Sequence, residues 1–142
     1  MPSASNEVII ERTADDVFGF LADPENDPQW RSGVLDITHV SGSGPGARYA
    51  QGVKGPGGRR IAADIEITEL TPGKFIAFQT LTGPVRPRGR YTISAADHGT
   101  RVRFELEANV KGLKRLIAPM VQRTMTNEVG QLDRLKRVME RP

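Results

Sequence analysis

The chain ends in a stretch, Gly112 to Pro142, that has the pattern of one long amphipathic helix. At 100° per residue its apolar side chains share one arc, namely Ile117, Val121, Met125, Leu132, Leu135 and Met139. The opposite arc carries Arg115, Gln122, Thr126, Asp133, Lys136, Arg137 and Arg141. A helix with one apolar face must bury that face, and the preceding sequence is strand-like. We therefore expect the helix to lie along a sheet.

The middle of the chain alternates apolar and polar residues with period two, which is typical of half-buried strands. The clearest examples are the runs 61–68 and 101–108. Turn sequences rich in Gly and Pro separate six such runs between residues 34 and 108. Six consecutive strands with tight connections predict an antiparallel meander that has one wet face and one covered face.

The first thirty residues add a strand at Val8–Ile10 and two short helices. Thr13 is the expected N-cap of the first helix, Asp23-Pro24 ends it, and the second stops at Trp30. The whole chain, 1–142, is expected to form a single α+β domain. Its expected order is a strand, two short helices, a six-strand meander and a long C-terminal helix kinked near Pro119.

Composition excludes several classes of function. The 142 residues include no cysteine, so disulfides and thiolate metal sites are excluded. The net charge of +3 is small and dispersed along the sequence, so we expect no nucleic-acid partner. His39 and His98 do not have the spacing of a metal site, and we expect neither a metal nor a cofactor. With no signal-peptide pattern and no membrane span, the expected location is the cytoplasm.

The order of elements resembles the helix-grip fold of the SRPBCC superfamily. The residues that carry the resemblance are segment 16–30, Gly99-Thr100 before the last strand, and Leu135-Lys136-Arg137. That superfamily includes START lipid-transfer domains and birch-pollen-allergen-like proteins. The chain is most similar to its small bacterial polyketide cyclase/dehydrase-like branch. The resemblance implies a cavity between a curved sheet and the final helix, but no catalytic motif transfers to this sequence.

Glu128 and Thr124 interrupt the apolar arc of the final helix. An unpaired carboxylate on that face would be costly. One interpretation is that Glu128 meets a ligand hydroxyl or acts as an acid or base, which makes it the candidate catalytic residue. The alternatives are that it pairs with an arginine at the cavity mouth, or that a kink at Pro119 turns it outward.

Aromatic side chains on or beside the apolar faces are the other candidates for ligand contact. The expected ligand-binding set is Trp30, Tyr49, Phe78, Tyr91, Phe104, Met120, Thr124 and Glu128. Ordinary core packing is the alternative for each aromatic residue. A buried tyrosine hydroxyl needs a partner, and a ligand could supply it.

A second pattern is a row of arginines at positions 86, 88, 90, 101 and 103. It is either a contact surface for an acidic partner or a solvated sheet face paired with Glu105 and Glu107. The glycine-rich segment 54–60 is expected to be a flexible hairpin tip.

Three functional hypotheses follow. The first is binding of a small hydrophobic or aromatic ligand in the cavity. The second is a cyclase, dehydratase or hydrolase acting on such a ligand, and the third is a protein-interaction module. The sequence is compatible with either a monomer or a homodimer.

Overall fold

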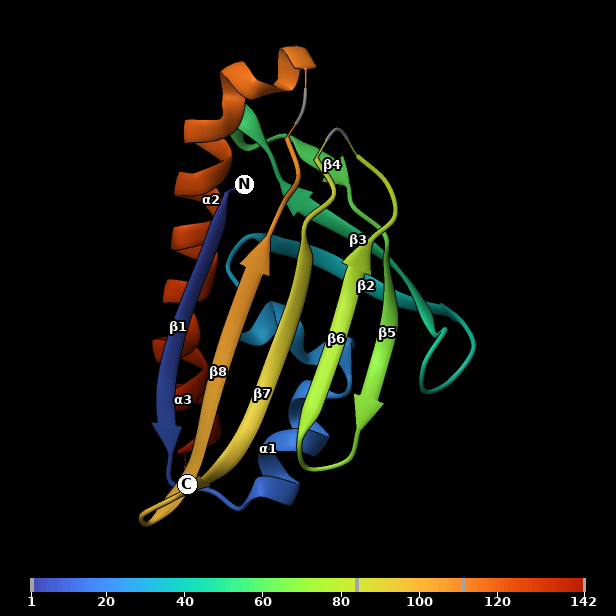
Figure 1. Cartoon of the computed structure of the whole chain (residues 1–142). Helices are drawn as coiled ribbons and strands as arrows, with labels where there is room; N and C mark the ends of the chain where they lie inside the picture. Colours follow the sequence, from blue (N-terminus) through green and yellow to red (C-terminus); the bar gives the residue numbers. More distant parts are fainter. Residues whose placement is uncertain (1, 84, 111, 142) are drawn as a thin grey trace.

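A computed structural model describes residues 2–83, 85–110 and 112–141, without the side chains of residues 112–114. The chain forms eight strands packed against three α-helices and three short 3-10 helices (Figure 1). The strands are β1 (Ser3–Ile10), β2 (Val34–Ser41), β3 (Arg48–Lys54), β4 (Arg60–Ala62), β5 (Ile65–Thr71), β6 (Phe75–Thr80), β7 (Arg88–Ala96) and β8 (Gly99–Glu107). The helical elements are α1 (Ala14–Leu21), η1 (Pro24–Gln29), η2 (Pro56–Gly58), η3 (Gly112–Ile117), α2 (Ala118–Gly130) and α3 (Leu132–Met139).

All strand pairs are antiparallel, in the order β1-β8-β7-β6-β5-β3-β2, with β4 added beside β3. Figure 1 shows that the sheet curls, so that β2 and β3 cross behind β5 and β6. The helices cover the inner face, where α2 and α3 run along β1. This is the α+β helix-grip architecture that the sequence predicted.

Alternation explains which residues form the core. On β8 the buried hydrophobic side chains are Val102, Phe104 and Leu106, and the charged residues between them face outward, as the alternation of the run 101–108 predicts. The final helix buries Val121, Met125 and Val129 in α2, and Leu132, Leu135 and Met139 in α3. The Thr13 hydroxyl accepts a hydrogen bond from the Asp16 amide, which confirms the expected N-cap.

Polar contacts fix the final helix to β1 along its length. The Gln122 side chain bonds to both the amide and the carbonyl of Ser3, the Asn6 amide donates to the Val129 carbonyl, and Lys136 Nζ donates to the Ile9 carbonyl. The helix is therefore attached to one edge of the sheet.

Two expectations about the elements were wrong in detail. The final segment is not one continuous helix, because a 3-10 turn precedes Ala118 and the α-helix is interrupted again at Gln131. The run 61–68 is not one strand: Ala63 and Asp64 interrupt it, so that β4 and β5 are separate and the described part of the meander has seven strands. Pro119 is at the start of α2, where its missing N–H costs little.

The 3-10 turn also separates residues 112–117 from the α-helix that begins at Ala118. A 3-10 helix rotates by a different angle per residue than an α-helix. The start of this segment therefore faces other directions than it would in one continuous α-helix. Met120 is 51 % exposed. Thr124 is also exposed, and its hydroxyl donates to the Met120 carbonyl. Leu113, near the start of the expected helix, is outside the described side chains.

Candidate functional site

A buried arginine, Arg31, joins two carboxylates between the sheet and the C-terminal helix. Its Nη1 donates to Asp27 Oδ2 and its Nε to Glu128 Oε2, both over 3.0 Å. The Arg31 and Asp27 residues are 5 % and 4 % exposed, whereas the Glu128 side chain is 18 % exposed. Glu128 therefore follows one of the alternatives drawn from the sequence: it pairs with an arginine, although that arginine is buried and not at a mouth.

The local sequence explains how these groups meet. Asp23 accepts a hydrogen bond from the Glu25 amide and thereby caps η1, and the Asp27 carbonyl accepts from the amides of Trp30 and Arg31. This turn places Asp27 and Arg31, four residues apart, on one side. Gly33 lets the helix approach, because a Cβ at this position would be 3.1 Å from Glu128 Oε1.

Four aromatic rings surround the arginine. Tyr91 and Phe104 stack with ring centroids 4.6 Å apart, and Trp30 meets both of them edge-on. The Arg31 guanidinium carbon lies 5.8 Å from the Phe104 centroid and 5.9 Å from that of Phe78. Such ring faces attract a guanidinium, so the rings and the two carboxylates together hold the charge. We call Asp27, Trp30, Arg31, Phe78, Tyr91, Phe104 and Glu128 the inner cluster.

Two hydrogen-bonding groups of the inner cluster have no partner among the described residues. They are the Trp30 indole Nε1 and the Tyr91 hydroxyl, and both atoms are buried. Buried polar atoms of this kind are nearly always satisfied in folded proteins, because leaving one unpaired costs about 1–3 kcal/mol. Each of the two atoms therefore remains available to an oxygen acceptor.

Burial and charge shift the pKa values of the inner cluster. Burial raises the pKa of Asp27 to about 6, although Arg31 opposes the change. Burial works against the charged form of Arg31, but Glu128 and Asp27 more than offset it and raise its pKa. Burial, reinforced by Asp27, raises the pKa of the Tyr91 phenol well above its usual range. The phenol is therefore a neutral donor, and Asp27 is a carboxyl group that titrates near neutral pH.

The structure brings together five of the eight residues expected from the sequence to contact a ligand: Trp30, Phe78, Tyr91, Phe104 and Glu128. Tyr49 lies apart from them, half buried, with its ring 5.1 Å from that of the exposed His39. Met120 and Thr124 are exposed and do not join the inner cluster. The sequence analysis missed Asp27 and Arg31. The feature that could have identified them is a carboxylate and a cation spaced four residues apart, on either side of the only tryptophan in the sequence.

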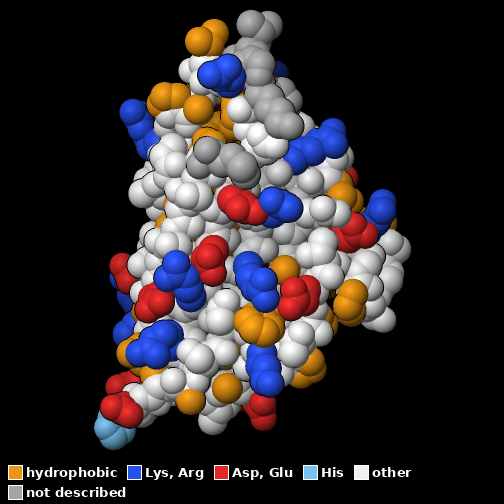
Figure 2. Space-filling model, in the orientation of Figure 1, with side chains coloured by type: hydrophobic (Ala, Val, Ile, Leu, Met, Phe, Trp, Pro, Cys, Tyr) orange, Lys and Arg blue, Asp and Glu red, His pale blue; other side chains and the backbone are white. Residues whose placement is uncertain are grey.

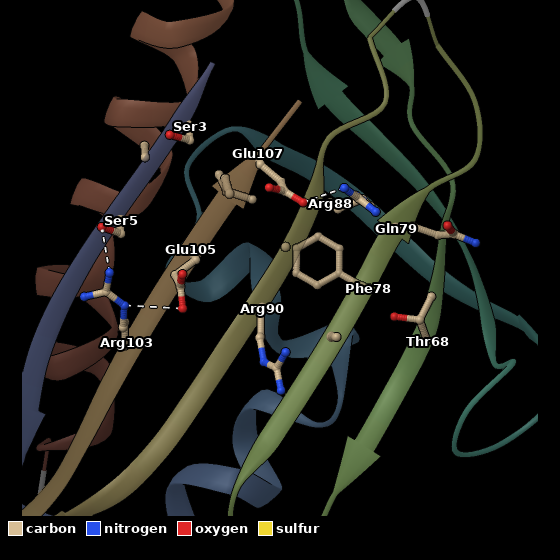
Figure 3. A pocket seen from close by; sticks show the side chains of 14 residues that line it. Ser3, Ser5, Thr68, Phe78, Gln79, Arg88, Arg90, Arg103, Glu105 and Glu107 are labelled. Atoms are coloured by element: carbon tan, nitrogen blue, oxygen red, sulfur yellow. Dashed lines mark hydrogen bonds and ion pairs between the residues drawn. The ribbon is translucent and has the colours of Figure 1, made fainter. Parts of the chain in front are cut away.

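The cavity that the sequence led us to expect between sheet and helix is not confirmed. Trp30 and Phe104 are 0 % exposed, and Met125 and Val129 of α2 are 3 % exposed, so side chains occupy this region. A shallow hollow of about 880 Å³ is found instead on the outer face of the sheet (Figure 3). The side chains drawn there include Ser5, Arg88, Arg103, Glu105 and Glu107.

The outer hollow is electrically balanced. Arg88 pairs with Glu107 at 2.6 Å and Arg103 with Glu105 at 3.3 Å. These pairs confirm the interpretation of the arginine row as a solvated face, and they reduce its attraction for an acidic partner. Within the described part of the chain, no group of three or more His, Asp or Glu side chains is placed to hold a metal ion. No helix in that part is long and apolar enough to cross a membrane.

The sequence matches the family described as "Polyketide cyclase / dehydrase and lipid transport" over residues 1–140. The chain therefore belongs to this family, in agreement with the polyketide cyclase/dehydrase-like branch that the sequence resembled. Among curated proteins, none has a significant sequence match to this chain.

Solved structures share the fold. TTHA0849 from Thermus thermophilus has a TM-score of 0.82 at 20 % identity, with 97 % of each chain covered. A START superfamily protein from Mycobacterium smegmatis has a TM-score of 0.80 at 17 % identity, again with 97 % of each chain covered. The di-domain ARO/CYC protein BexL of the BE-7585A biosynthetic pathway has a TM-score of 0.76 at 20 % identity. That alignment covers 99 % of this chain and 50 % of BexL.

Proposed function

We propose that this protein binds a small hydrophobic or aromatic molecule at the inner cluster, between the sheet and α2. The observation that carries the proposal is the pair of unpartnered buried donors, Trp30 Nε1 and the Tyr91 hydroxyl, within a set of aromatic rings. A flat molecule with carbonyl or ether oxygens would contact the rings and accept from both donors. The family description, which combines polyketide cyclases and lipid transport, agrees with such a ligand.

Ligand entry requires the inner cluster to open, because its side chains pack against one another. Two polar links cross the opening: Arg31 Nε donates to Glu128 Oε2, and Ser32 Oγ donates to Gln131 Oε1, each over 3.0 Å. Since α2 is otherwise fixed to β1 through Gln122 and Asn6, the side of α2 that faces η1 is the side expected to separate. The affinity for a ligand is then reduced by the cost of populating the open state.

Trp30 makes the proposal easy to test, because it is the only tryptophan of the chain. We expect 1-naphthol and 9-fluorenone to change its fluorescence in a saturable way. Native mass spectrometry of the purified protein should show the same probes bound with 1:1 stoichiometry. The proposal fails if the emission is unchanged while calorimetry also detects no binding.

The arginine row offers a matched control for this titration. Arg103→Gln alters the outer hollow, 42 % exposed at that side chain, and leaves the inner cluster intact. It should bind the probes as the unchanged protein does, whereas Phe104→Ala should weaken binding at least tenfold. Equal loss from both variants would place the probes outside the inner cluster.

An enzyme that acts on the same ligand is the second candidate, and the buried Asp27 carboxyl is the observation that favours it. A carboxyl with a pKa of about 6 exchanges a proton readily near neutral pH. Glu128 is the other candidate acid or base, because its carboxylate lies in the same cluster and accepts from Arg31 Nε. If turnover of a polyketide-like substrate is found, Glu128→Gln and Asp27→Asn should each abolish it and retain binding. Unchanged turnover in both variants would exclude this role.

A further inference from the structure

The basic residues are distributed unevenly along the chain. Three segments, 54–60, 81–88 and 108–127, contain nine of the 20 Lys and Arg residues and none of the 17 Asp and Glu residues. The remainder of the chain has 11 basic against 17 acidic residues. The net positive charge is therefore concentrated in these three segments, whereas the remainder of the chain has more acidic than basic residues.

The fold brings the described residues of these three segments to one end of the molecule. Figure 1 shows β4, the connection from β6 to β7, and the start of the final helix at the same end. The Leu81 amide donates to the Asp64 carbonyl, which places the second segment beside β4. Arg88 is paired in register with Glu107, so the third segment begins next to the end of the second. We call these three segments the basic end.

The cations of the basic end are largely free. Lys54, Arg59, Arg86, Arg115 and Arg123 are exposed and form no ion pair with any described residue. Arg60 and Arg88 do form pairs, with Asp36 and Glu107 on the adjoining strands. The basic end therefore carries an excess of positive charge that its surroundings neutralise only in part.

Large apolar side chains are exposed at the basic end as well. Leu116 is 83 % exposed and Met120 is 51 % exposed, between Arg115 and Arg123 in the sequence. Figure 2 shows hydrophobic and basic side chains side by side at this end. Exposed aliphatic groups next to cations are typical of helices that lie in a membrane interface.

We propose that the basic end docks on the surface of an anionic lipid membrane, with Leu116 and Met120 entering the interface. Nucleic acid is the less suitable partner, because the three segments contain no aromatic residue on which bases could stack. The aliphatic side chains favour lipid, and the arginines favour acidic headgroups. This inference does not depend on which ligand the inner cluster binds.

Vesicle flotation with the full chain tests the proposal. The vesicles are phosphatidylcholine alone, or phosphatidylcholine with about one third phosphatidylglycerol. We expect binding to the anionic vesicles only, with a loss of at least tenfold when NaCl rises from about 50 to about 500 mM. Arg115→Gln with Arg123→Gln should weaken binding about thirtyfold, and Leu116→Ser with Met120→Ser about tenfold.

Matched controls separate docking from general charge effects. Arg134→Gln with Arg137→Gln removes two exposed arginines from α3, away from the basic end, and should change binding less than about threefold. Val40→Ser removes a side chain that is 63 % exposed on β2 and should have no effect. Equal binding to neutral vesicles, equal loss in the controls, or binding to an RNA oligonucleotide without vesicle binding would overturn the proposal.

Discussion

The Nε of Arg31 donates to Glu128 Oε2 over 3.0 Å, across 97 residues of chain. This bond connects the turn after η1 to the last turn of α2, and Asp27 completes the arrangement from the other side. The guanidinium therefore makes polar contacts with both carboxylates of the inner cluster, one on each side of it. Its removal should affect stability and ligand binding together.

We expect Arg31→Met to lower the free energy of unfolding by about 3–5 kcal/mol at pH 7, because it leaves two carboxylates without their cation. Glu128→Gln should cost less, about 1–3 kcal/mol, since the side chain is partly exposed and the amide oxygen still accepts. Urea denaturation measures both. The exposed Arg103→Gln is the control and should cost less than about 1 kcal/mol. A loss for Arg31→Met no larger than that of the control would contradict the described geometry.

Asp27 should give the protein a distinctive pH dependence. Its folded-state pKa of about 6 is above the ordinary value of 3.8, so the native state holds the proton more tightly than the unfolded state. The contribution of Asp27 is fully present below pH 3.8 and is lost as the pH rises through about 6. The loss amounts to about 3 kcal/mol at one unit of pKa per 1.36 kcal/mol.

Asp27→Asn should remove this slope between about pH 4 and pH 6, as followed by urea denaturation at each pH. Asp133→Asn, on the exposed side of α3, controls for the general effect of a lost charge. The same slope in both variants would show that Asp27 is not the group responsible.

Substitution of Tyr91 should affect stability and ligand binding differently. Because its hydroxyl is buried without a partner among the described residues, Tyr91→Phe should leave stability unchanged or raise it by about 1 kcal/mol. The same variant should bind 9-fluorenone about tenfold more weakly, since it lacks one of the two donors. Thermal unfolding and fluorescence titration check the two parts. Destabilisation by more than about 1 kcal/mol would mean that the hydroxyl has a partner in the folded protein.

Gly89 is required by the packing of Phe78. A Cβ at Gly89 would overlap the Phe78 ring, which lies across this position of β7. Gly89→Ala should therefore lower stability by about 1–3 kcal/mol. Gly19→Ala is the matched control, because its added Cβ meets nothing within 4 Å and α1 gains helix propensity; it should stabilise by about 0.5–1 kcal/mol. Equal effects from both substitutions would show that Phe78 moves freely.

Most of the fold could be predicted because local patterns and tertiary structure agree. Alternation identified the buried side of β8, and the Thr13 cap and the Asp23-Pro24 boundary fixed the first helices. The differences arise where a local irregularity interrupts a regular helix or strand. The final segment begins as a 3-10 turn and becomes α-helical only at Ala118, and the break at Ala63–Asp64 divides one expected strand into two.

The site was harder to predict because its charged members come from distant parts of the chain. Periodicity marked Glu128 as anomalous, but it did not say which cation lies opposite. Arg31 looked like an ordinary surface residue after a turn, and only the curvature that brings η1 against α2 buries it. The same holds for the basic end, whose three segments meet only after the sheet forms.

The central claim is that a ligand with oxygen acceptors binds between the rings of the inner cluster. The indole N–H of Trp30 gives a single proton resonance in ¹H–¹⁵N spectra, because the chain has one tryptophan. On addition of 9-fluorenone we predict that this resonance moves downfield and saturates, as Nε1 gains an acceptor. A fixed indole resonance, with shifts confined to amides around the outer hollow such as Gln79 and Glu105, would contradict the account.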